Sequence, residues 1–286
     1  MAPRSVKKPT PGNPADAGQR WHPRVRAGTG GWTYAPWRNN FFPAGLVQRR
    51  ELEYASRHLT TIEVNGTYYG AQKPASYAAW RAQTPDGFVF ALKAPRYATE
   101  RRELAGAGKT IKDFVFGGLA ELGDRLGPIN WQFSEDKTFA RDDFATFLDL
   151  LPRELDGRSL RHVLEVRGES FRCAEYVDLV RSHALPTVFT DSPKYPSFAD
   201  LTGDFVYARL MQSESEIPTG YSDAALDAWA KRALVWSAGG EPEDLPRIGA
   251  AQTGRAKARE VFIYFINGAK ERAPAAAMAL LGRLSS

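Results

Sequence analysis

Short runs of β-branched and aromatic residues recur along the chain, and each run ends near a polar or charged residue that a packed core would not favour. We place these runs at residues 25–32, 60–69, 88–95, 128–133, 162–167, 187–191, 205–211 and 261–267. Most of the gaps between them are long enough to hold a helix. Eight strands with crossover helices predict an α/β fold, a TIM-like (β/α)8 barrel.

Apolar residues at helical spacing fill most of the gaps. They predict helices at residues 48–58, 76–83, 114–126, 142–151, 174–184, 222–237 and 274–284. Residues 96–113 are predicted to form a long polar connection, of the length that functional loops have. Between the sixth and seventh strands, residues 192–204 contain Pro193, Pro196 and Gly203, so we expect an irregular connection there.

Composition places the chain among ordinary globular proteins, with 286 residues of which 43% are hydrophobic and 25% are charged. The net charge is +5, and residues 1–24 carry much of it. This segment is rich in Pro, Gly and Ala, and we predict a disordered basic tail. Residues 25–286 are predicted to form a single barrel domain with a loop insertion near 239–259.

Targeting signals do not stand out. No run approaches the ~18–20 apolar residues of a membrane span, and residues 1–24 lack the apolar stretch of a secretory signal. The single Cys173 excludes an intrachain disulfide. We therefore expect a cytoplasmic protein without membrane contact. The basic tail makes nucleic acid a possible but not a favoured partner, and the oligomeric state stays open.

The polar residues at the strand ends carry the candidate chemistry. Glu63, Asn65 and Thr67 share one face of the second predicted strand, and Glu165 and Arg167 share one face of the fifth. The residues between them are apolar and are expected to pack on helices, so the polar side chains should point into the barrel. Buried carboxylates are costly unless they are paired or functional. The sequence therefore predicts a charged pocket at the C-terminal rim, and a ring of structural salt bridges is the alternative.

Within this pocket, we expect Glu63, Glu165 and Asp191 to be catalytic, because carboxylates serve as general acids and bases. Arginine and lysine bind phosphate and carboxylate groups, amides orient them, and aromatic rings stack on ligands. The residues expected to bind the substrate in these ways are Trp32, Tyr34, Asn65, Tyr68, Lys93, Gln132, Arg167, Arg209 and Asn267.

No cofactor is expected. The glycine-rich segment 28–32 lacks the spacing of a dinucleotide-binding fingerprint, and close backbone approach explains its glycines better. An oxygen-ligand metal site built from Glu63, Glu165 and Asp191 is an alternative, but the basic residues expected in the same space oppose it. The four histidines are scattered, which argues against a zinc site.

Several of these segments resemble a known family, the YecE-like proteins, which are the domain-of-unknown-function family number seventy-two. The matching segments include residues 28–32 (GTGGW), 63–69 (EVNGTYY), 165–167 (EVR) and 264–267 (YFIN). The resemblance implies a TIM-like barrel and no established activity. Members commonly have histidines where this chain has Glu100 and Gly168.

These observations lead to one functional hypothesis and its alternatives. We expect acid–base or hydrolytic chemistry on a small polar, anionic substrate at the C-terminal rim, with Glu63 and Glu165 as acid and base. A non-catalytic ligand-binding or nucleic-acid-binding protein on the same barrel is one alternative. An inactive family member, suggested by the two absent histidines, is another. The sequence does not decide whether the protein is an enzyme.

Overall fold

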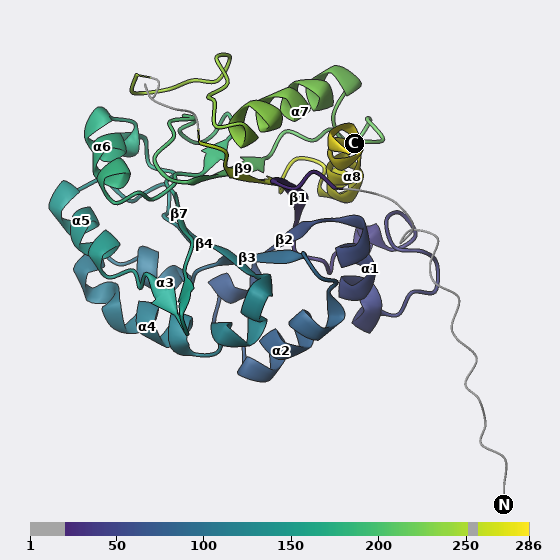
Figure 1. The fold of residues 1–286 in the computed structure, drawn as a ribbon, viewed down its shortest axis with the longest axis horizontal. Coiled ribbons are helices and arrows are strands. Elements are labelled where there is room, and N and C mark those ends of the chain that lie inside the picture. Colours follow the sequence, from purple (N-terminus) through teal and green to yellow (C-terminus); the bar gives the residue numbers. More distant parts are fainter. Residues whose placement is uncertain (1–20, 251–256, 286) are drawn as a thin grey trace, which may run out of the picture.

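The computed structural model describes residues 21–250 and 257–285, which form a barrel of parallel strands surrounded by helices (Figure 1). The eight-stranded sheet has the order β7-β4-β3-β2-β1-β10-β9-β8. Its strands are β1 (Val25–Gly30), β2 (Thr61–Val64), β3 (Val89–Lys93), β4 (Leu126–Gln132), β7 (His162–Glu165), β8 (Phe189–Thr190), β9 (Phe205–Leu210) and β10 (Glu260–Phe265). The predicted fold class is confirmed.

The two edge strands of this sheet, β7 and β8, meet and close the ring. A parallel bridge pairs Leu164 with Thr187, and the Val188 N–H donates to the Leu164 carbonyl oxygen at 2.9 Å. Because every neighbouring pair in the sheet is also parallel, all strands end at the same rim. The polar residues that follow the strands are therefore collected at one end of the barrel.

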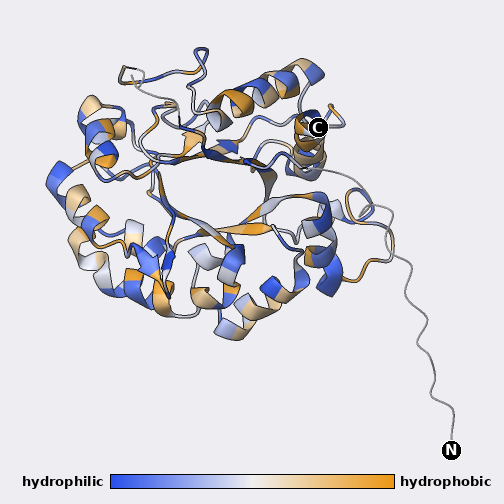
Figure 2. Cartoon of the chain, viewed as in Figure 1, coloured by the Kyte–Doolittle hydropathy of each residue, from blue (hydrophilic) through white to orange (hydrophobic). Residues whose placement is uncertain are grey.

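Helices cover the outside of the barrel. They are α1 (Glu51–His58), α2 (Pro74–Gln83), α3 (Arg96–Thr99), α4 (Gly108–Phe116), α5 (Arg141–Asp149), α6 (Ala174–Ser182), α7 (Asp223–Ser237) and α8 (Ala273–Leu284). Figure 2 shows hydrophilic residues on their outward faces. Among the helices of residues 21–250 and 257–285, none is long and apolar enough to cross a membrane.

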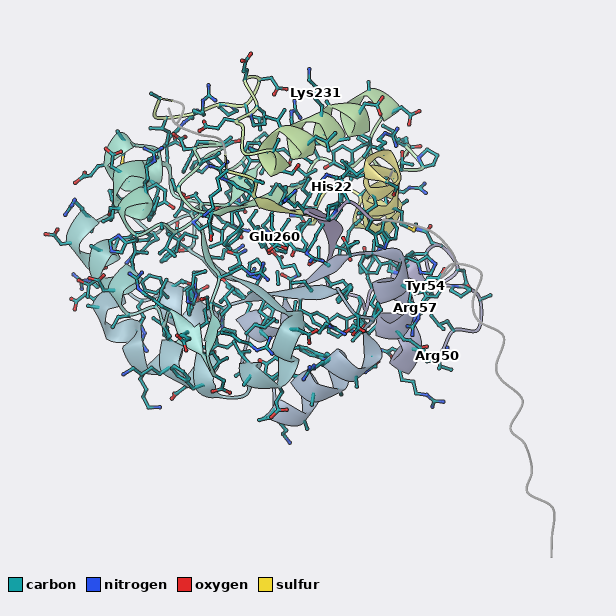
Figure 3. All side chains as sticks on the ribbon, viewed as in Figure 1. His22, Arg50, Tyr54, Arg57, Lys231 and Glu260 are labelled. Atoms are coloured by element: carbon teal, nitrogen blue, oxygen red, sulfur yellow. The ribbon has the colours of Figure 1, made fainter. Side chains whose placement is uncertain are left out.

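Alternation along the strands sorts side chains between two cores, as the sequence pattern predicts. In β9, Val206 and Ala208 belong to the large core between barrel and helices, whereas Phe205 and Tyr207 belong to a smaller core inside the barrel. Figure 3 shows that side chains fill the ring, so the barrel is a packed core and not a pore. Arg209 continues the inward series toward the rim.

Two predicted elements were wrong in extent. The helix predicted at 114–126 is instead α4, a break at Gly117 and Gly118, and a 3-10 helix (Leu119–Arg125). Gly118 has a φ of +135°, which a helix does not accommodate. The connection predicted at 96–113 is correspondingly not one loop, because it contains α3, a 3-10 helix (Leu104–Ala107) and the start of α4.

The second strand is also shorter than predicted, since β2 ends at Val64 and a 3-10 turn (Gly66–Tyr68) follows. The Thr67 hydroxyl donates to the Lys93 carbonyl oxygen at 2.7 Å, which turns the chain toward β3 instead of extending the strand. Strand alternation therefore does not extend to Asn65 and Thr67.

The connection between β8 and β9 contains no helix or strand, as predicted for the sixth and seventh strands of the barrel. A small hairpin of β5 (Glu154–Leu155) and β6 (Arg158–Ser159) precedes β7 and was not predicted. Most of the predicted tail, residues 1–20, lies outside the described residues, and so do residues 251–256 of the predicted insertion. Trp21 packs against the large core.

Candidate functional site

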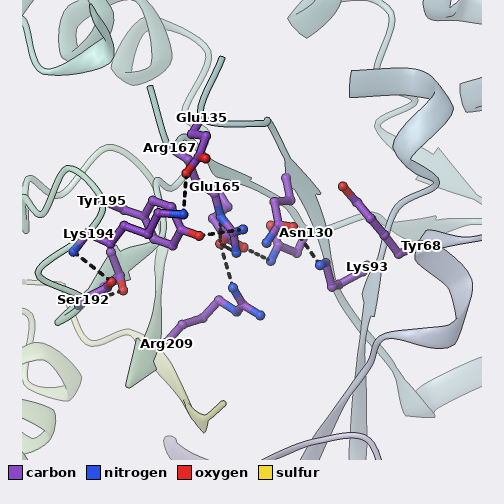
Figure 4. A network of polar contacts seen from close by, with 12 residues as sticks. Tyr68, Lys93, Asn130, Glu135, Glu165, Arg167, Ser192, Lys194, Tyr195 and Arg209 are labelled. Carbon is purple, nitrogen blue, oxygen red and sulfur yellow. Dashed lines mark hydrogen bonds and ion pairs between the residues drawn. The ribbon is translucent and has the colours of Figure 1, made fainter. Parts of the chain in front are cut away.

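Polar side chains from five strands meet inside the barrel at its C-terminal end. We call this group the mouth cluster. Its members lie at or near the last residue of β2, β3, β4, β7 and β9, or directly after β7. They are Glu63, Lys93, Asn130, Gln132, Glu165, Arg167 and Arg209. Figure 4 shows Lys93, Asn130, Glu165, Arg167 and Arg209 of this group.

Arg209 joins the two glutamates of the cluster. Its guanidinium donates through Nη1 to Glu165 Oε1 at 2.6 Å and through Nη2 to Glu63 Oε1 at 3.0 Å. The Tyr207 hydroxyl donates to Glu63 Oε2 at 2.6 Å. All of these side chains are buried. Breaking such a network by removing one partner leaves an uncompensated charge without water, which is strongly unfavourable.

Glu165 receives more hydrogen bonds than any other acid of the cluster. Besides Arg209, Arg167 donates to its Oε1 through Nε and Nη2 at 2.9 and 2.7 Å, and Asn130 Nδ2 donates to Oε2 at 2.9 Å. Burial favours the neutral acid, but the positive charges of Arg209, Arg167 and Lys93 outweigh it and hold the pKa of Glu165 well below its usual range. Glu165 is therefore a fixed anion near neutral pH.

Lys93 has different surroundings. Its Nζ donates to Gln132 Oε1 at 2.8 Å and lies 4.0 Å from the centre of the Tyr68 ring. It takes part in none of the ion pairs of the described residues. Burial, and next the positive charge of Arg209, lower the pKa of Lys93 to about 8. Among the cations of the cluster, Lys93 is the one whose protonation changes near neutral pH.

Tyr68 covers this amine from the turn after β2. Its hydroxyl donates to Glu100 Oε1 at 3.0 Å. Burial, together with the hydrogen bond to Glu100, raises the pKa of Tyr68 to about 12, so the phenol stays neutral. Glu100 therefore anchors the ring that Lys93 contacts.

Asp191 does not join the cluster. Its carboxylate accepts a hydrogen bond from the Met211 N–H at 2.6 Å and interacts with the Tyr221 hydroxyl. Burial raises the pKa of Asp191 to about 6 in spite of these bonds. The carboxylate thus links β8 to the residues after β9.

No three His, Cys, Asp or Glu side chains of residues 21–250 and 257–285 gather as a metal site.

Two aromatic residues predicted to bind the substrate have other contacts. Trp32 packs edge to face on Trp80, with 5.2 Å between the ring centres. Tyr34 packs on Trp37 at 5.5 Å, and Lys270 Nζ lies 4.7 Å from the centre of the Tyr34 ring. Neither contacts the mouth cluster through an interaction that the described residues show.

Two of the three amides predicted to bind the substrate, Asn65 and Asn267, form no side-chain hydrogen bond with the mouth cluster among the described residues. The Asn65 side chain lies over Gly30, where an added Cβ would come within 2.9 Å of Asn65 Nδ2. Asn267 is exposed, and its backbone oxygen accepts from the Ser213 hydroxyl at 2.9 Å. Close backbone approach explains the strand-one glycines, as predicted, because a Cβ on Gly28 would meet the Thr61 carbonyl oxygen at 1.8 Å.

Sequence reasoning missed three residues of this region, which are Tyr207, Asn130 and Tyr195. Asn130 bonds Glu165, and its position two residues before Gln132 on the same strand face was a usable signal. Tyr195 lies in the irregular β8–β9 connection, where Arg167 stacks 4.4 Å from its ring centre. No periodicity in that connection distinguishes Tyr195 from its neighbours.

The model of the family described as "Protein of unknown function DUF72" matches residues 26–286 of this chain. The chain belongs to this family. The resemblance to YecE-like proteins, which is another name for it, is confirmed. No curated protein matches the chain.

Solved DUF72 structures share the barrel. One from Thermotoga maritima is 20% identical with a TM-score of 0.66, and the match covers 90% of this chain and 96% of that chain. Another from Enterococcus faecalis is 16% identical with a TM-score of 0.64, over 91% of this chain and 97% of that one. A structure named SacUVDE is 10% identical with a TM-score of 0.51, over 91% and 96%. At these identities the likeness shows the fold alone.

Proposed function

We propose that this DUF72 protein is an enzyme that binds a small anionic substrate at the C-terminal mouth of the barrel and exchanges a proton with it through Lys93. The mouth cluster contains three cations and two carboxylates when Lys93 is protonated, and this excess of positive charge favours an anion. Carboxylate and phosphate are the groups that such side chains recognise.

The unequal pairing of the cations carries this proposal. Arg167 and Arg209 both bond Glu165, whereas Lys93 contacts only an amide oxygen and an aromatic face among the described residues. An anionic group beside Lys93 would therefore gain the charge interaction that Glu165 gives the arginines. A pKa of about 8 also lets Lys93 give and take a proton near neutral pH, as general acid–base catalysis requires.

Glu63 and Glu165 have a supporting part in this proposal, in contrast to the acid and base roles that the sequence suggested. Glu63 accepts from Arg209 and Tyr207, and Glu165 accepts from both arginines and Asn130. The lowered pKa of Glu165 makes this carboxylate poor at taking up a proton. We assign the two glutamates to positioning the arginines, and proton exchange to Lys93.

Two measurements test the proposal on the full chain. Inorganic phosphate should raise the Tm of the wild type, and the protein should accelerate exchange of the pyruvate methyl protons in D2O, followed by NMR. Lys93→Met should lose both effects. Lys270→Met is the matched control, because Lys270 is also a partly buried amine on a tyrosine face, and it should behave as the wild type.

The outcomes separate the alternatives. Stabilisation by phosphate without proton exchange would favour the non-catalytic ligand-binding protein. If neither phosphate nor pyruvate changes the Tm and no exchange occurs, the proposed anion site is wrong. Strongly salt-dependent binding of oligonucleotides that Lys93→Met does not alter would instead favour a nucleic-acid-binding surface elsewhere on the barrel.

A further inference from the structure

The Lys93 amine is placed as a nucleophile would be. Only 7% of the residue is exposed, so most of the side chain is excluded from water. Gln132 Oε1 accepts one of its N–H groups, and no carboxylate oxygen lies within 4.0 Å among the described residues. A lysine that lacks a carboxylate partner loses its proton readily and attacks carbonyl carbons.

The same surroundings suit the product of such an attack. A protonated imine keeps one N–H and one positive charge on the lysine nitrogen. The N–H would stay on Gln132 Oε1, and the charge would stay over the Tyr68 ring, whose centre is 4.0 Å from Nζ. The two contacts that hold the ammonium group therefore need no rearrangement to hold the imine.

Two amide atoms beside Lys93 have no hydrogen-bond partner although they are buried, namely Asn130 Oδ1 and Gln132 Nε2. Asn130 pairs with Lys93 in the β3–β4 register, and Gln132 follows on the same strand face. Such atoms are costly to leave unsatisfied. Gln132 Nε2 offers a donor to a carbonyl oxygen, and Asn130 Oδ1 offers an acceptor to the hydroxyl that this oxygen becomes after attack.

Arg167 selects the class of carbonyl compound. Its side chain is 21% exposed, against 3% for Arg209, and its Nη1 makes only a long contact of 3.4 Å with the Tyr195 hydroxyl. It is the arginine of the cluster with donor capacity open to solvent. A carboxylate adjacent to the carbonyl would bind Arg167 while the carbonyl carbon faces Lys93.

We propose that Lys93 forms a reversible imine with a small 2-oxo carboxylate, an inference that rests on the anion site of the proposed function. The neutral amine attacks the carbonyl carbon, a C–N bond forms, and the carbonyl oxygen takes up a proton to give a carbinolamine. The hydroxyl then takes up a proton from solvent and leaves as water, and the nitrogen lone pair forms the C=N bond of the protonated imine. One neutral amine, one carbonyl compound and one proton give one protonated imine and one water, with no change of oxidation state.

Borohydride trapping tests the imine on the full chain. Pyruvate is added, the mixture is reduced with sodium borohydride, and intact mass and peptide mapping locate the adduct. We expect a single adduct on Lys93 that excess inorganic phosphate suppresses. Lys93→Arg keeps the charge but is not expected to form the adduct, and it should still gain Tm with phosphate. Lys270→Met should form the adduct on Lys93 as the wild type does.

The failures are distinguishable. If phosphate raises the Tm and pyruvate protons exchange, but no adduct is trapped, Lys93 acts as a base only and the imine is wrong while the proposed function stands. Adducts spread evenly over Lys270 and other lysines would also overturn the imine. If no anion changes the Tm and no adduct forms, both the imine and the anion site are wrong.

Discussion

Both ends of the barrel carry an ion-pair cluster, and the contrast between them shows what water does to a charge. At the N-terminal end, Arg26 Nε lies 3.4 Å from Glu260 Oε1, and Arg161 Nη1 lies 2.5 Å from Glu260 Oε2. We call these three residues the floor cluster. Figure 3 labels Glu260 within the ring of strands. The floor cluster and the mouth cluster each have one more cation than they have carboxylates.

The two clusters differ in their access to water. The side chains of the floor cluster are 21–37% exposed, whereas those of Arg209, Glu63 and Glu165 are 4% exposed or less. Water solvates the extra positive charge at the floor. At the mouth, the extra charge falls on the group that most easily releases its proton, which is Lys93. The same excess of one positive charge is therefore solvated at the floor, whereas at the mouth it lies on a group that can release its proton.

Removing one arginine from each end gives the largest expected difference. Arg209→Met should lower the free energy of unfolding by about 4 kcal/mol, because it leaves Glu63 and Glu165 buried without their shared partner. Arg161→Met should cost about 1 kcal/mol or less, because Glu260 stays partly hydrated. Urea unfolding at pH 7 measures both. Equal losses would show that burial does not distinguish the clusters.

The pH dependence of stability that Lys93 causes gives a second way to compare the two ends. Its pKa of about 8 lies below the ordinary value of 10.5, so the unfolded chain binds more protons between these values and stability rises with pH there. This contribution is present above pH 10.5 and is lost as the pH falls through 8, and it amounts to about 3 kcal/mol. Lys93→Met should lack it. Unfolding at pH 7.5 and 10 measures the difference, and an unchanged slope in Lys93→Met would refute it.

Asp191 tests a rim acid outside the mouth cluster. Its pKa of about 6 lies above the ordinary 3.8, so its favourable contribution is present below pH 3.8 and is lost as the pH rises through 6. Asp191→Asn keeps a neutral acceptor for the Met211 N–H. We expect this variant to match the wild type near pH 4 and to be more stable by about 1–2 kcal/mol at pH 7, after allowance for partial exposure. Thermal unfolding at both pH values measures it.

The smallest expected effect is the change of unfolding free energy with salt, which again compares the two clusters. Glu260→Gln should cost about 0.5 kcal/mol at low ionic strength and less in 1 M NaCl, because exposed pairs are screened. The cost of Arg209→Met should change little with salt, since the mouth pairs are shielded from ions. A strongly salt-dependent cost of Arg209→Met would mean that ions reach the pairs of Arg209 with Glu63 and Glu165.

Much of the fold follows from local patterns. In the run 162–167, the apolar Leu164 and Val166 alternate with Glu165 and Arg167, and this alternation predicted that the two charged side chains point into the barrel. The prediction of one helix over 114–126 was wrong because Gly118 interrupts it. The spacing of apolar residues does not reveal such a turn of the backbone. The second strand was overextended because the Thr67 hydroxyl bonds the Lys93 carbonyl oxygen of a neighbouring strand, a long-range contact that alternation cannot show.

The sequence by itself determined a parallel barrel and the inward face of its regular strands, because alternation and strand count are local properties. Only the tertiary structure decided which charged side chains pair with each other. Arg209 lies between Glu63 and Glu165, Asp191 turns to Met211, and Lys93 is left with neutral contacts. These pairings depend on strand register and on the exclusion of water, which arise only when distant segments come together, and they decide which charged group is free to react.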